Sequence, residues 1–402
     1  MLTNPLVYPD EVLRPSRGSA AMIPSEIRIM SVECERLHGV NLAQGICDTP
    51  TPDVVREAAK EAITAGLNQY VRLDGIPPLR TAIATKLREF NHLDYDPERE
   101  IVVTNGSTGA FYAACCALLD PGDEIIAFEP FYSYHLNTLS ALGAKPVLVQ
   151  LAAPAWTLSL QELAAAITPK TRAIILNSPS NPCGKVFSLD ELCAIAELAA
   201  EHDLFVFTDE IYEYFLYDGR AHISFATLPG MRERTITISG FSKTFSVTGW
   251  RIGYLACDPR WKQPIAYYHD LNYICAPSPL QVGVAAGLEQ LGADFYTGLA
   301  ADYDRKRTLV CDALRKAGLT PSVPEGAYYV LADASALPGT DSKQKAMFLL
   351  ENSGVAAVPG SAFFESGRGD NFLRFCFAKT DADLTDAVTR LHAFAHTGVA
   401  KA

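Results

Sequence analysis

Short apolar runs alternate with longer amphipathic segments through the middle of the chain. The runs are rich in β-branched residues and are typical of buried strands, while the segments between them have the spacing of helices. The predicted strands cover residues 101–104, 124–128, 145–151, 173–176, 204–208, 235–239 and 253–257. Most are separated by roughly 15 to 25 residues, the spacing of strand–helix–strand crossover units. We therefore expect an α/β fold in which helices flank a mainly parallel sheet of seven strands.

The two flanks of this region have a different pattern. Residues 1–48 are punctuated by prolines and contain one amphipathic segment, 25–37, which predicts an irregular arm with a single helix. Further helices are predicted near 53–65 and over 295–317, and apolar stretches follow at 324–333, 358–364 and 372–378. The predicted organisation is an N-terminal arm that joins part of a small domain (1–48), a large domain (49–290) and a small C-terminal α+β domain (291–402).

The composition limits the class of partner. The chain has 402 residues, of which 49% are hydrophobic, so it is long enough to bury a large core. Its formal net charge is −12, and charges of both signs are interspersed. This pattern disfavours nucleic acids and anionic membranes as partners, so we expect a small-molecule substrate.

The cysteines and the N-terminus indicate the compartment. The ten cysteines include no C-x-x-C pair, which is typical of reduced thiols. The N-terminal residues contain no apolar signal-peptide core, and no apolar run approaches the 18 residues of a membrane span. We therefore expect a cytoplasmic protein. His392 and His396 have the i,i+4 spacing of metal ligands, but no third ligand matches them. We interpret them as part of a solvated helix face and expect no metal.

The strongest chemical signal lies in residues 235–257, where a predicted strand leads into a Gly/Ser-rich bend that contains Lys243. A lone lysine at a strand end is more often a surface side chain, but a buried one has a lowered pKa and can form a Schiff base with a carbonyl. Arg251, eight residues later, has the planar fork that grips a phosphate, and Ser239 and Ser242 add hydroxyl donors. A phosphate-binding P-loop is excluded, because Ser242 stands where that motif requires glycine.

Other predicted strands also end in polar groups. Residues 105–110, NGSTGA, turn from strand to helix and can place backbone N–H groups and the hydroxyls of Ser107 and Thr108 on an anion. The turn lacks the G-x-G-x-x-G pattern of a dinucleotide site, which disfavours a Rossmann dehydrogenase. Asp209 ends a hydrophobic strand, where a carboxylate needs a cationic partner. Arg374 interrupts the apolar run 372–378, so we expect an anion to meet it.

Several segments together resemble one enzyme family. The pattern S-K-T-F-x-x-x-G-W-R-x-G at 242–253 resembles the lysine segment of the class I/II aminotransferases, which are fold-type-I pyridoxal-phosphate enzymes, and is similar to aspartate, aromatic and kynurenine aminotransferase-like members. Residues 177–184 resemble the family's N-x-P-x-N-P-x-G, and 70–80 resemble its Y-x-x-x-x-G-x-x-x-L-R. With NLAQG at 41–45 and the arginine of 372–378, the motifs follow the family order over most of the chain.

The resemblance implies a cofactor, pyridoxal 5′-phosphate, bound to Lys243 as a Schiff base. The other implied cofactor contacts are Arg251, Ser107, Thr108, Ser239 and Ser242 around the phosphate, Asp209 at the pyridine nitrogen, Asn181 and Tyr212 at the phenolate oxygen, and Tyr132, or else Phe131, stacked on the ring. Gly45, Asn181 and Arg374 are implied to bind the substrate carboxylate. Tyr70 is implied to reach the phosphate of a neighbouring subunit, so a homodimer with shared active sites is expected.

The implied function is transamination between an L-amino acid and a 2-oxo acid by a ping-pong mechanism, with Lys243, Asp209 and Tyr212 as the catalytic residues. A β-lyase of the cysteine-conjugate type on the same fold stays open, because carbanion formation also permits elimination. A non-catalytic regulator fused to a DNA-binding domain is disfavoured, because fewer than 50 residues precede Gly45 and the chain is acidic.

The run 267–275 bears on the side chain that the enzyme accepts. Aspartate-specific members of one subgroup have an arginine here, contributed by the partner subunit, whereas this run has no arginine or lysine and contains Tyr267, Tyr268 and Tyr273. After Gly45 the family usually continues with F-P-D or E-P-D, but this chain has the apolar Ile46 and Cys47 before its aspartate. We predict a preference for aromatic or other neutral amino acids over aspartate, with aspartate aminotransferase as the alternative. Glutamate is expected as an amino donor, tolerated through a rearrangement of the pocket or through another cation that the sequence does not identify.

Overall fold

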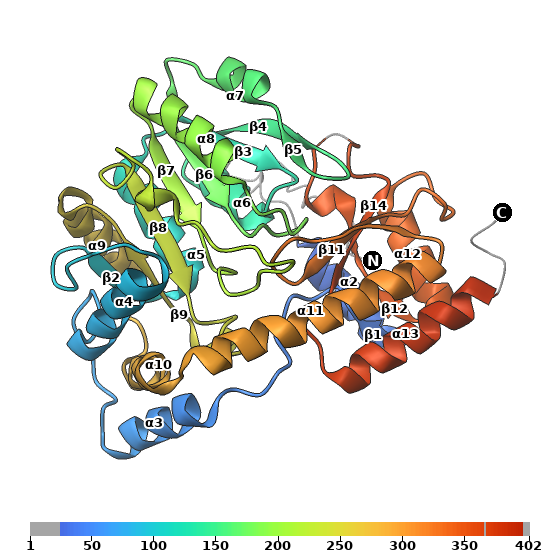
Figure 1. Ribbon diagram of the computed structural model, residues 1–402, viewed down its shortest axis with the longest axis horizontal. Coiled ribbons are helices and arrows are strands. Elements are labelled where there is room, and N and C mark those ends of the chain that lie inside the picture. Colours follow the sequence, from blue (N-terminus) through green and yellow to red (C-terminus); the bar gives the residue numbers. More distant parts are fainter. Residues whose placement is uncertain (1–24, 366, 397–402) are drawn as a thin grey trace, which may run out of the picture.

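A computed structural model describes residues 25–365 and 367–396 (Figure 1). The proline-rich segment predicted as an irregular arm lies mostly at 1–24, outside the described residues. The three helices predicted outside the strand-rich region are confirmed as α2 (Glu26–Arg36), α3 (Asp53–Thr64) and α11 (Ala293–Lys316). No helix in the described part of the chain is long and apolar enough to cross a membrane. All ten cysteines lie in that part and are free thiols.

The larger sheet has eight strands in the order β2-β9-β8-β7-β6-β3-β4-β5. Their bounds are β2 Ile101–Asn105, β3 Glu124–Glu129, β4 Lys145–Ala152, β5 Thr157–Leu158, β6 Thr171–Asn177, β7 Phe205–Asp209, β8 Thr235–Gly240 and β9 Ile252–Ala256. Strands β4, β3, β6, β7 and β8 are parallel, whereas β9 runs antiparallel to both of its neighbours. The seven predicted strands are confirmed. The eighth, β5, is too short to produce a period-2 pattern in the sequence.

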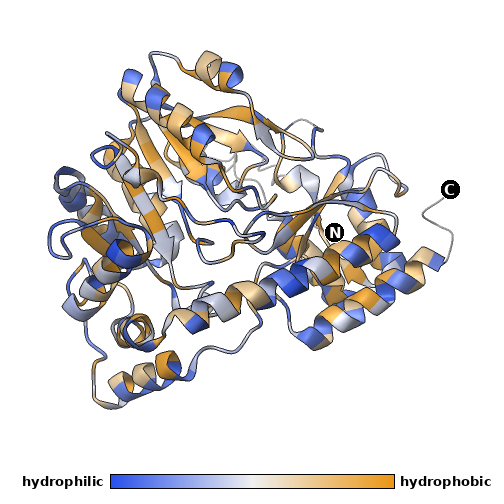
Figure 2. Cartoon of the chain, in the orientation of Figure 1, coloured by the Kyte–Doolittle hydropathy of each residue, from blue (hydrophilic) through white to orange (hydrophobic). Residues whose placement is uncertain are grey.

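Helices cover both faces of this sheet, because its strands are apolar on both sides. Ile175 of β6 packs in the cluster that contains Phe111 of α5 (Gly106–Leu118), while its neighbour Ile174 packs on the opposite face with Ile195 of α8 (Leu189–Glu201). The remaining helices associated with this sheet are α4 Pro77–Phe90, α6 Ser133–Ala141, α7 Leu160–Ala166, α9 Pro259–Tyr273 and α10 Ser278–Gln290. Figure 2 shows the hydrophobic strands enclosed between helices whose outer faces are hydrophilic.

A second sheet lies at the other end of the molecule, in the order β10-β11-β14-β13, with all neighbours antiparallel (Figure 1). Its strands are β10 Thr320–Ser322, β11 Tyr329–Asp333, β13 Val358–Pro359 and β14 Phe372–Cys376, and it packs with α12 Ser342–Ser353 and α13 Asp381–His396. Near it, β1 (Val40–Asn41) pairs in parallel with β12 (Val355–Ala356). Helix α11 extends along both parts of the molecule. The domain boundaries at 48/49 and 290/291 stay a prediction.

The parallel strands end at one edge of the large sheet, and the predicted site residues follow them there. The register pairs Asn177 with Asp209 and Asp209 with Ile238, so β6, β7 and β8 end side by side. The lysine-containing bend leaves the end of β8. Ligands of open parallel sheets bind outside this edge, because loops diverge there and leave a crevice.

Candidate active site

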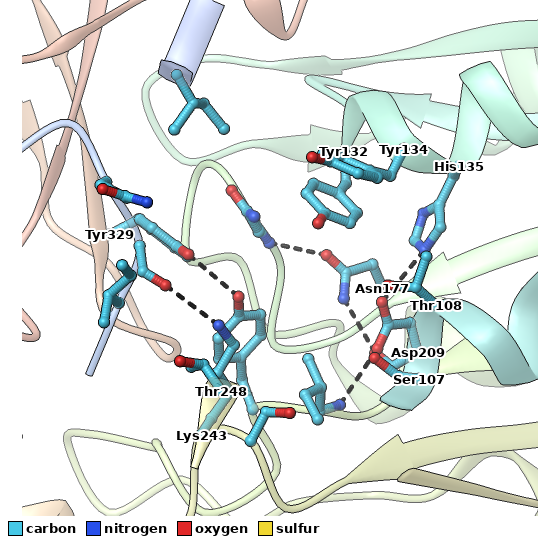
Figure 3. A pocket seen from close by; sticks show the side chains of 18 of the residues that line it. Ser107, Thr108, Tyr132, Tyr134, His135, Asn177, Asp209, Lys243, Thr248 and Tyr329 are labelled. Carbon is cyan, nitrogen blue, oxygen red and sulfur yellow. Dashed lines mark hydrogen bonds and ion pairs between the residues drawn. The ribbon is translucent and has the colours of Figure 1, made fainter. Parts of the chain in front are cut away.

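A cavity of about 310 Å³ opens at this edge, between the two parts of the molecule (Figure 3). The predicted site residues that line it are Gly45, Ser107, Thr108, Tyr132, Asn181, Asp209, Tyr212, Ser242, Lys243, Arg251 and Arg374. The lining residues that the sequence analysis did not single out as site residues are Ser25, Ile27, Arg28, Gln44, Ile46, Phe111, Tyr134, His135, Asn177, Ile211, Thr248 and Tyr329. Residues far apart in sequence thus form one polar and aromatic site.

Lys243 lies in the bend between β8 and the 3₁₀ turn η2 (Thr248–Trp250). Its Nζ donates a hydrogen bond to the carbonyl oxygen of Gly45 at 3.1 Å. Burial lowers the pKa of Lys243 below the usual 10.5, and the nearby cations Arg251 and Arg374 lower it further. No carboxylate pairs with this amine in the described chain, so the environment favours the neutral, nucleophilic form.

The guanidinium of Arg251 lies close to Gly106, the first residue of α5. The backbone of Arg251 is left-handed, with φ 55° and ψ 49°, and its Nη1 donates to the Thr248 carbonyl oxygen at 3.0 Å. Gly106, with φ +73°, lies directly against the guanidinium, since a Cβ there would be 2.4 Å from Arg251 Nη2. Ser107 and Thr108 follow in the first turn of α5. The guanidinium, the helix N-terminus and these hydroxyls form a cradle for an anion.

Asp209, at the end of β7, is buried and faces the imidazole of His135. The distance from His135 Nε2 to Asp209 Oδ2 is 3.2 Å, and Figure 3 shows the ring pointing at the carboxylate. The backbone N–H of Ile211 donates to Asp209 Oδ1 at 3.3 Å. The sequence predicted a cationic partner for Asp209 but not His135. The sequence offered one signal that His135 could belong to the site, namely its place three residues after Tyr132 in the segment that follows β3.

Arg374 of β14 is 1% exposed, yet no carboxylate pairs with it in the described residues. Its Nη1 donates to Asn181 Oδ1 at 2.9 Å and its Nη2 to the Ala43 carbonyl oxygen at 2.7 Å, while its Nε has no partner. The guanidinium lies 4.3 Å from the ring centroid of Tyr329. A buried cation with a free donor at a cavity wall has the properties expected of an anion site, and the role of Arg374 in binding an anion stays a prediction.

Tyrosines form much of the remaining wall. The hydroxyl groups of Tyr212 and Tyr329 are 3.2 Å apart, and burial raises the pKa of Tyr212 well above its usual value. Gly45 is required beside them, because a Cβ there would lie 2.0 Å from the Tyr329 hydroxyl oxygen. Tyr132 lines the cavity with its ring stacked on that of Tyr134 at 5.2 Å, whereas Phe131 is not among the residues that line it. The sequence left open whether Tyr132 or Phe131 stacks on the cofactor ring, and the position of Tyr132 in the cavity wall favours Tyr132.

Ser239 does not line the cavity, which corrects its predicted role as a cofactor contact. Its hydroxyl donates to Glu213 Oε1 at 2.9 Å, and Glu213 Oε2 also lies 2.5 Å from Lys86 Nζ and accepts from Asn91 at 2.9 Å. Successive side chains of a strand point to opposite faces, so a residue inside β8 can be near the bend in sequence and still point away from it.

Tyr70 is also outside the cavity of its own chain, with 77% of its surface exposed. The aromatic residues predicted to shape the substrate pocket, Tyr267, Tyr268 and Tyr273, lie on α9, are 40–57% exposed and do not line this cavity either. None of these four tyrosines lines the cavity of its own chain.

The cavity is positively charged. Three arginines, Arg28, Arg251 and Arg374, line it, and Asp209 is the one carboxylate among its described lining residues. This excess of cations suits a ligand with several negative charges, such as a phosphate combined with a carboxylate.

Comparisons with known proteins agree with this geometry. A profile of the aminotransferase class I and II family matches residues 38–391. The chain is 35% identical over 378 residues to kynurenine–oxoglutarate transaminase 1 of Homo sapiens, covering 86% of this chain and 90% of the relative. It is 37% identical over 372 residues to aspartate aminotransferase of Pyrococcus abyssi, covering 92% and 95%. The structure of N-succinyldiaminopimelate aminotransferase from Mycobacterium tuberculosis superimposes with a TM-score of 0.91 at 36% identity, covering 95% of this chain and all of that one.

The chain therefore belongs to the aminotransferase class I and II family and has the fold of its fold-type-I members. It is an aminotransferase, and it acts on small-molecule amino and keto acids.

Proposed function

We propose that the chain uses pyridoxal 5′-phosphate to transfer an amino group from glutamate or another L-amino acid to a 2-oxo acid, with a preference for aromatic or neutral side chains. The observation that carries this proposal is the set of three basic side chains, Lys243, Arg251 and Arg374, which line one cavity without carboxylate partners in the described chain. The anion cradle at Gly106 and the free Nε of Arg374 fit a ligand with a phosphate at one place and a carboxylate at another.

In this proposal each lining residue holds one part of the cofactor. Lys243 would carry it covalently, and Arg251, Ser107, Thr108 and Ser242 would hold its phosphate. The ring would lie between Asp209 and Tyr132, with Asn181 and Tyr212 at its phenolate oxygen. The cofactor supplies an electron sink for the carbanion formed when Cα of the amino acid loses its proton.

The chain's own residues would orient the substrate and move this proton. Arg374 and the turn at Gly45 would hold the α-carboxylate, which restricts rotation about Cα. The Lys243 amine, with its lowered pKa, is suited to take the proton from Cα and return it at the other end of the transfer. His135 would hold Asp209 in place, because its imidazole already lies at 3.2 Å from the carboxylate.

The preference for aromatic or neutral side chains is supported by the wall of the cavity. Ile27, Ile46, Tyr134 and Tyr329 are apolar or aromatic lining residues. The human relative is named for kynurenine and oxoglutarate, and the Pyrococcus relative, named for aspartate, is about equally similar. Similarity alone therefore does not select the side chain, and the proposal rests on the wall.

A half-reaction screen tests this proposal. Single amino acids are added to the purified holoenzyme, and loss of the visible absorption of the cofactor Schiff base is followed. We then expect kcat/KM for phenylalanine and methionine to exceed that for aspartate with a common 2-oxo acid. A preference for aspartate of more than about tenfold, or roughly 1.4 kcal/mol in transition-state binding, would contradict the proposed specificity.

We also propose that the active unit is a homodimer in which Tyr70 completes the partner's phosphate site. The support is a patch of exposed apolar side chains at the end of α9, namely Tyr267, Tyr268, Leu271, Tyr273 and Ile274. The patch approaches the cavity, since a Cβ at Gly109 of α5 would lie 3.6 Å from the Tyr273 ring. Mixing the inactive variants Tyr70→Ala and Lys243→Ala is expected to restore part of the activity, whereas a fully active monomer would refute the shared site.

A further inference from the structure

The cavity contains one cation that the proposed reaction leaves without a role. Lys243, Arg251 and Arg374 have the cofactor carbonyl, its phosphate and the substrate α-carboxylate as proposed partners. Arg28, in the first turn of α2, lines the same cavity and is exposed. Its backbone N–H donates to the Ser25 carbonyl oxygen at 3.0 Å, but its side chain makes no hydrogen bond or ion pair with any described residue. Its guanidinium is therefore available to an anion that enters the cavity.

The acids near Arg28 are already paired with other groups. Asp209, the one carboxylate of the described cavity wall, faces His135. Glu26, in the same helical turn as Arg28, forms an ion pair with Lys343 of α12 at 3.1 Å. Neither acid forms an ion pair with Arg28, so no described carboxylate neutralises its charge.

A hydroxyl donor accompanies Arg28. Ser25 occupies the N-cap position of α2, yet its side chain makes no capping hydrogen bond, and it also lines the cavity. Residues three apart lie on one face of a helix, so Ser25 and Arg28 face the cavity together. A guanidinium beside a hydroxyl is suited to bind a carboxylate by charge-assisted hydrogen bonds.

We propose that Arg28, with the hydroxyl of Ser25, binds the distal carboxylate of glutamate and of 2-oxoglutarate. This inference rests on the proposed function and identifies the cation that glutamate requires. It also explains how one cavity accepts both charged and neutral side chains. Arg28 is exposed, so it remains solvated when a neutral side chain is bound, whereas a buried arginine would be left unpaired at a large electrostatic cost.

The test compares glutamate with glutamine, which has nearly the same size but no side-chain charge, and with the neutral, larger phenylalanine. In the holoenzyme variant Arg28→Gln, we expect kcat/KM for glutamate to fall about 10- to 100-fold, because a charge-assisted interaction is lost. For glutamine and phenylalanine we expect changes of less than about threefold. The matched control is Arg36→Gln, which removes an exposed arginine from the last turn of the same helix, away from the cavity lining. This control should leave all three values at the wild-type level.

Calorimetric binding provides a readout that is independent of turnover. Glutarate should bind Arg28→Gln about 10-fold more weakly than wild type, while butyrate should bind both equally. If glutarate affinity and the glutamate kcat/KM of Arg28→Gln stay within twofold of wild type, the assignment of Arg28 is overturned. If the wild-type enzyme transaminates phenylalanine but neither glutamate nor 2-oxoglutarate, the inference is also overturned while the proposed transamination of neutral amino acids stands. If the wild-type enzyme does not transaminate phenylalanine, the proposed function is refuted instead.

Discussion

Replacing Gly106 by alanine tests the proposed phosphate cradle. A Cβ at this position would lie 2.4 Å from Arg251 Nη2 and 2.9 Å from its Cζ, so the guanidinium must move. If one charge-assisted hydrogen bond to the cofactor phosphate is lost, the cost is about 1.5–3 kcal/mol, which corresponds to a roughly 10- to 150-fold weaker dissociation constant for pyridoxal 5′-phosphate. The backbone of Gly106 is left-handed, with φ +73°, so alanine also adds strain of about 1–2 kcal/mol to the folded state.

Gly230→Ala separates these two effects. Gly230 has nearly the same φ, +72°, but no atom lies within 4 Å of a Cβ built there. Both variants should therefore have a melting temperature lowered by a few degrees, and only Gly106→Ala should bind the cofactor weakly. The assay is titration of the cofactor-free protein, followed by absorbance, with thermal unfolding measured in parallel. Equal cofactor affinity in the two variants would refute the proposed contact between Arg251 and the phosphate.

Three further predictions concern Lys243, Asp209 and Lys86. Only a neutral amine forms a Schiff base with the cofactor, and the pKa of Lys243 is lowered. The rate at which cofactor-free protein binds the cofactor covalently should therefore rise with pH and level off below pH 10.5. A rate that still rises at pH 10.5 would contradict the lowered pKa. Asp209→Ala should lower kcat by at least about 10² to 10³-fold, since the charge that stabilises the protonated ring is removed, and near-normal kinetics would exclude this role. Lys86→Met should lower the free energy of unfolding by about 3 kcal/mol, because Glu213, whose side chain is 3% exposed, loses its cation at 2.5 Å. Urea denaturation measures this loss, and the double variant Lys86→Met/Glu213→Gln should recover much of it if the unpaired charge is the cause.

Much of the fold was predictable because its signals are local. The predicted strands of the large sheet are short, largely apolar runs, and β2, β3, β6, β7 and β9 contribute side chains to cores on both faces, so their burial can be predicted from the run itself. The exception is β5, an edge strand of two residues that pairs only with β4. The bend with Lys243 and the position of Arg251 were also predictable, because both lie within one continuous segment between β8 and β9.

The strands, their ends and the residue types placed there could therefore be predicted from the sequence. Which of these residues come into contact depends on tertiary packing. His135 lies in α6 and Asp209 at the end of β7, Tyr329 reaches Tyr212 from the second sheet, and Arg28 enters the cavity from a helix near the start of the described chain. Ser239 shows the converse, since it lies four residues before Lys243 and points to Glu213 instead. The physical reason is that periodicity reports which side of an element is buried, whereas the partner on that side is set by how elements distant in sequence pack together.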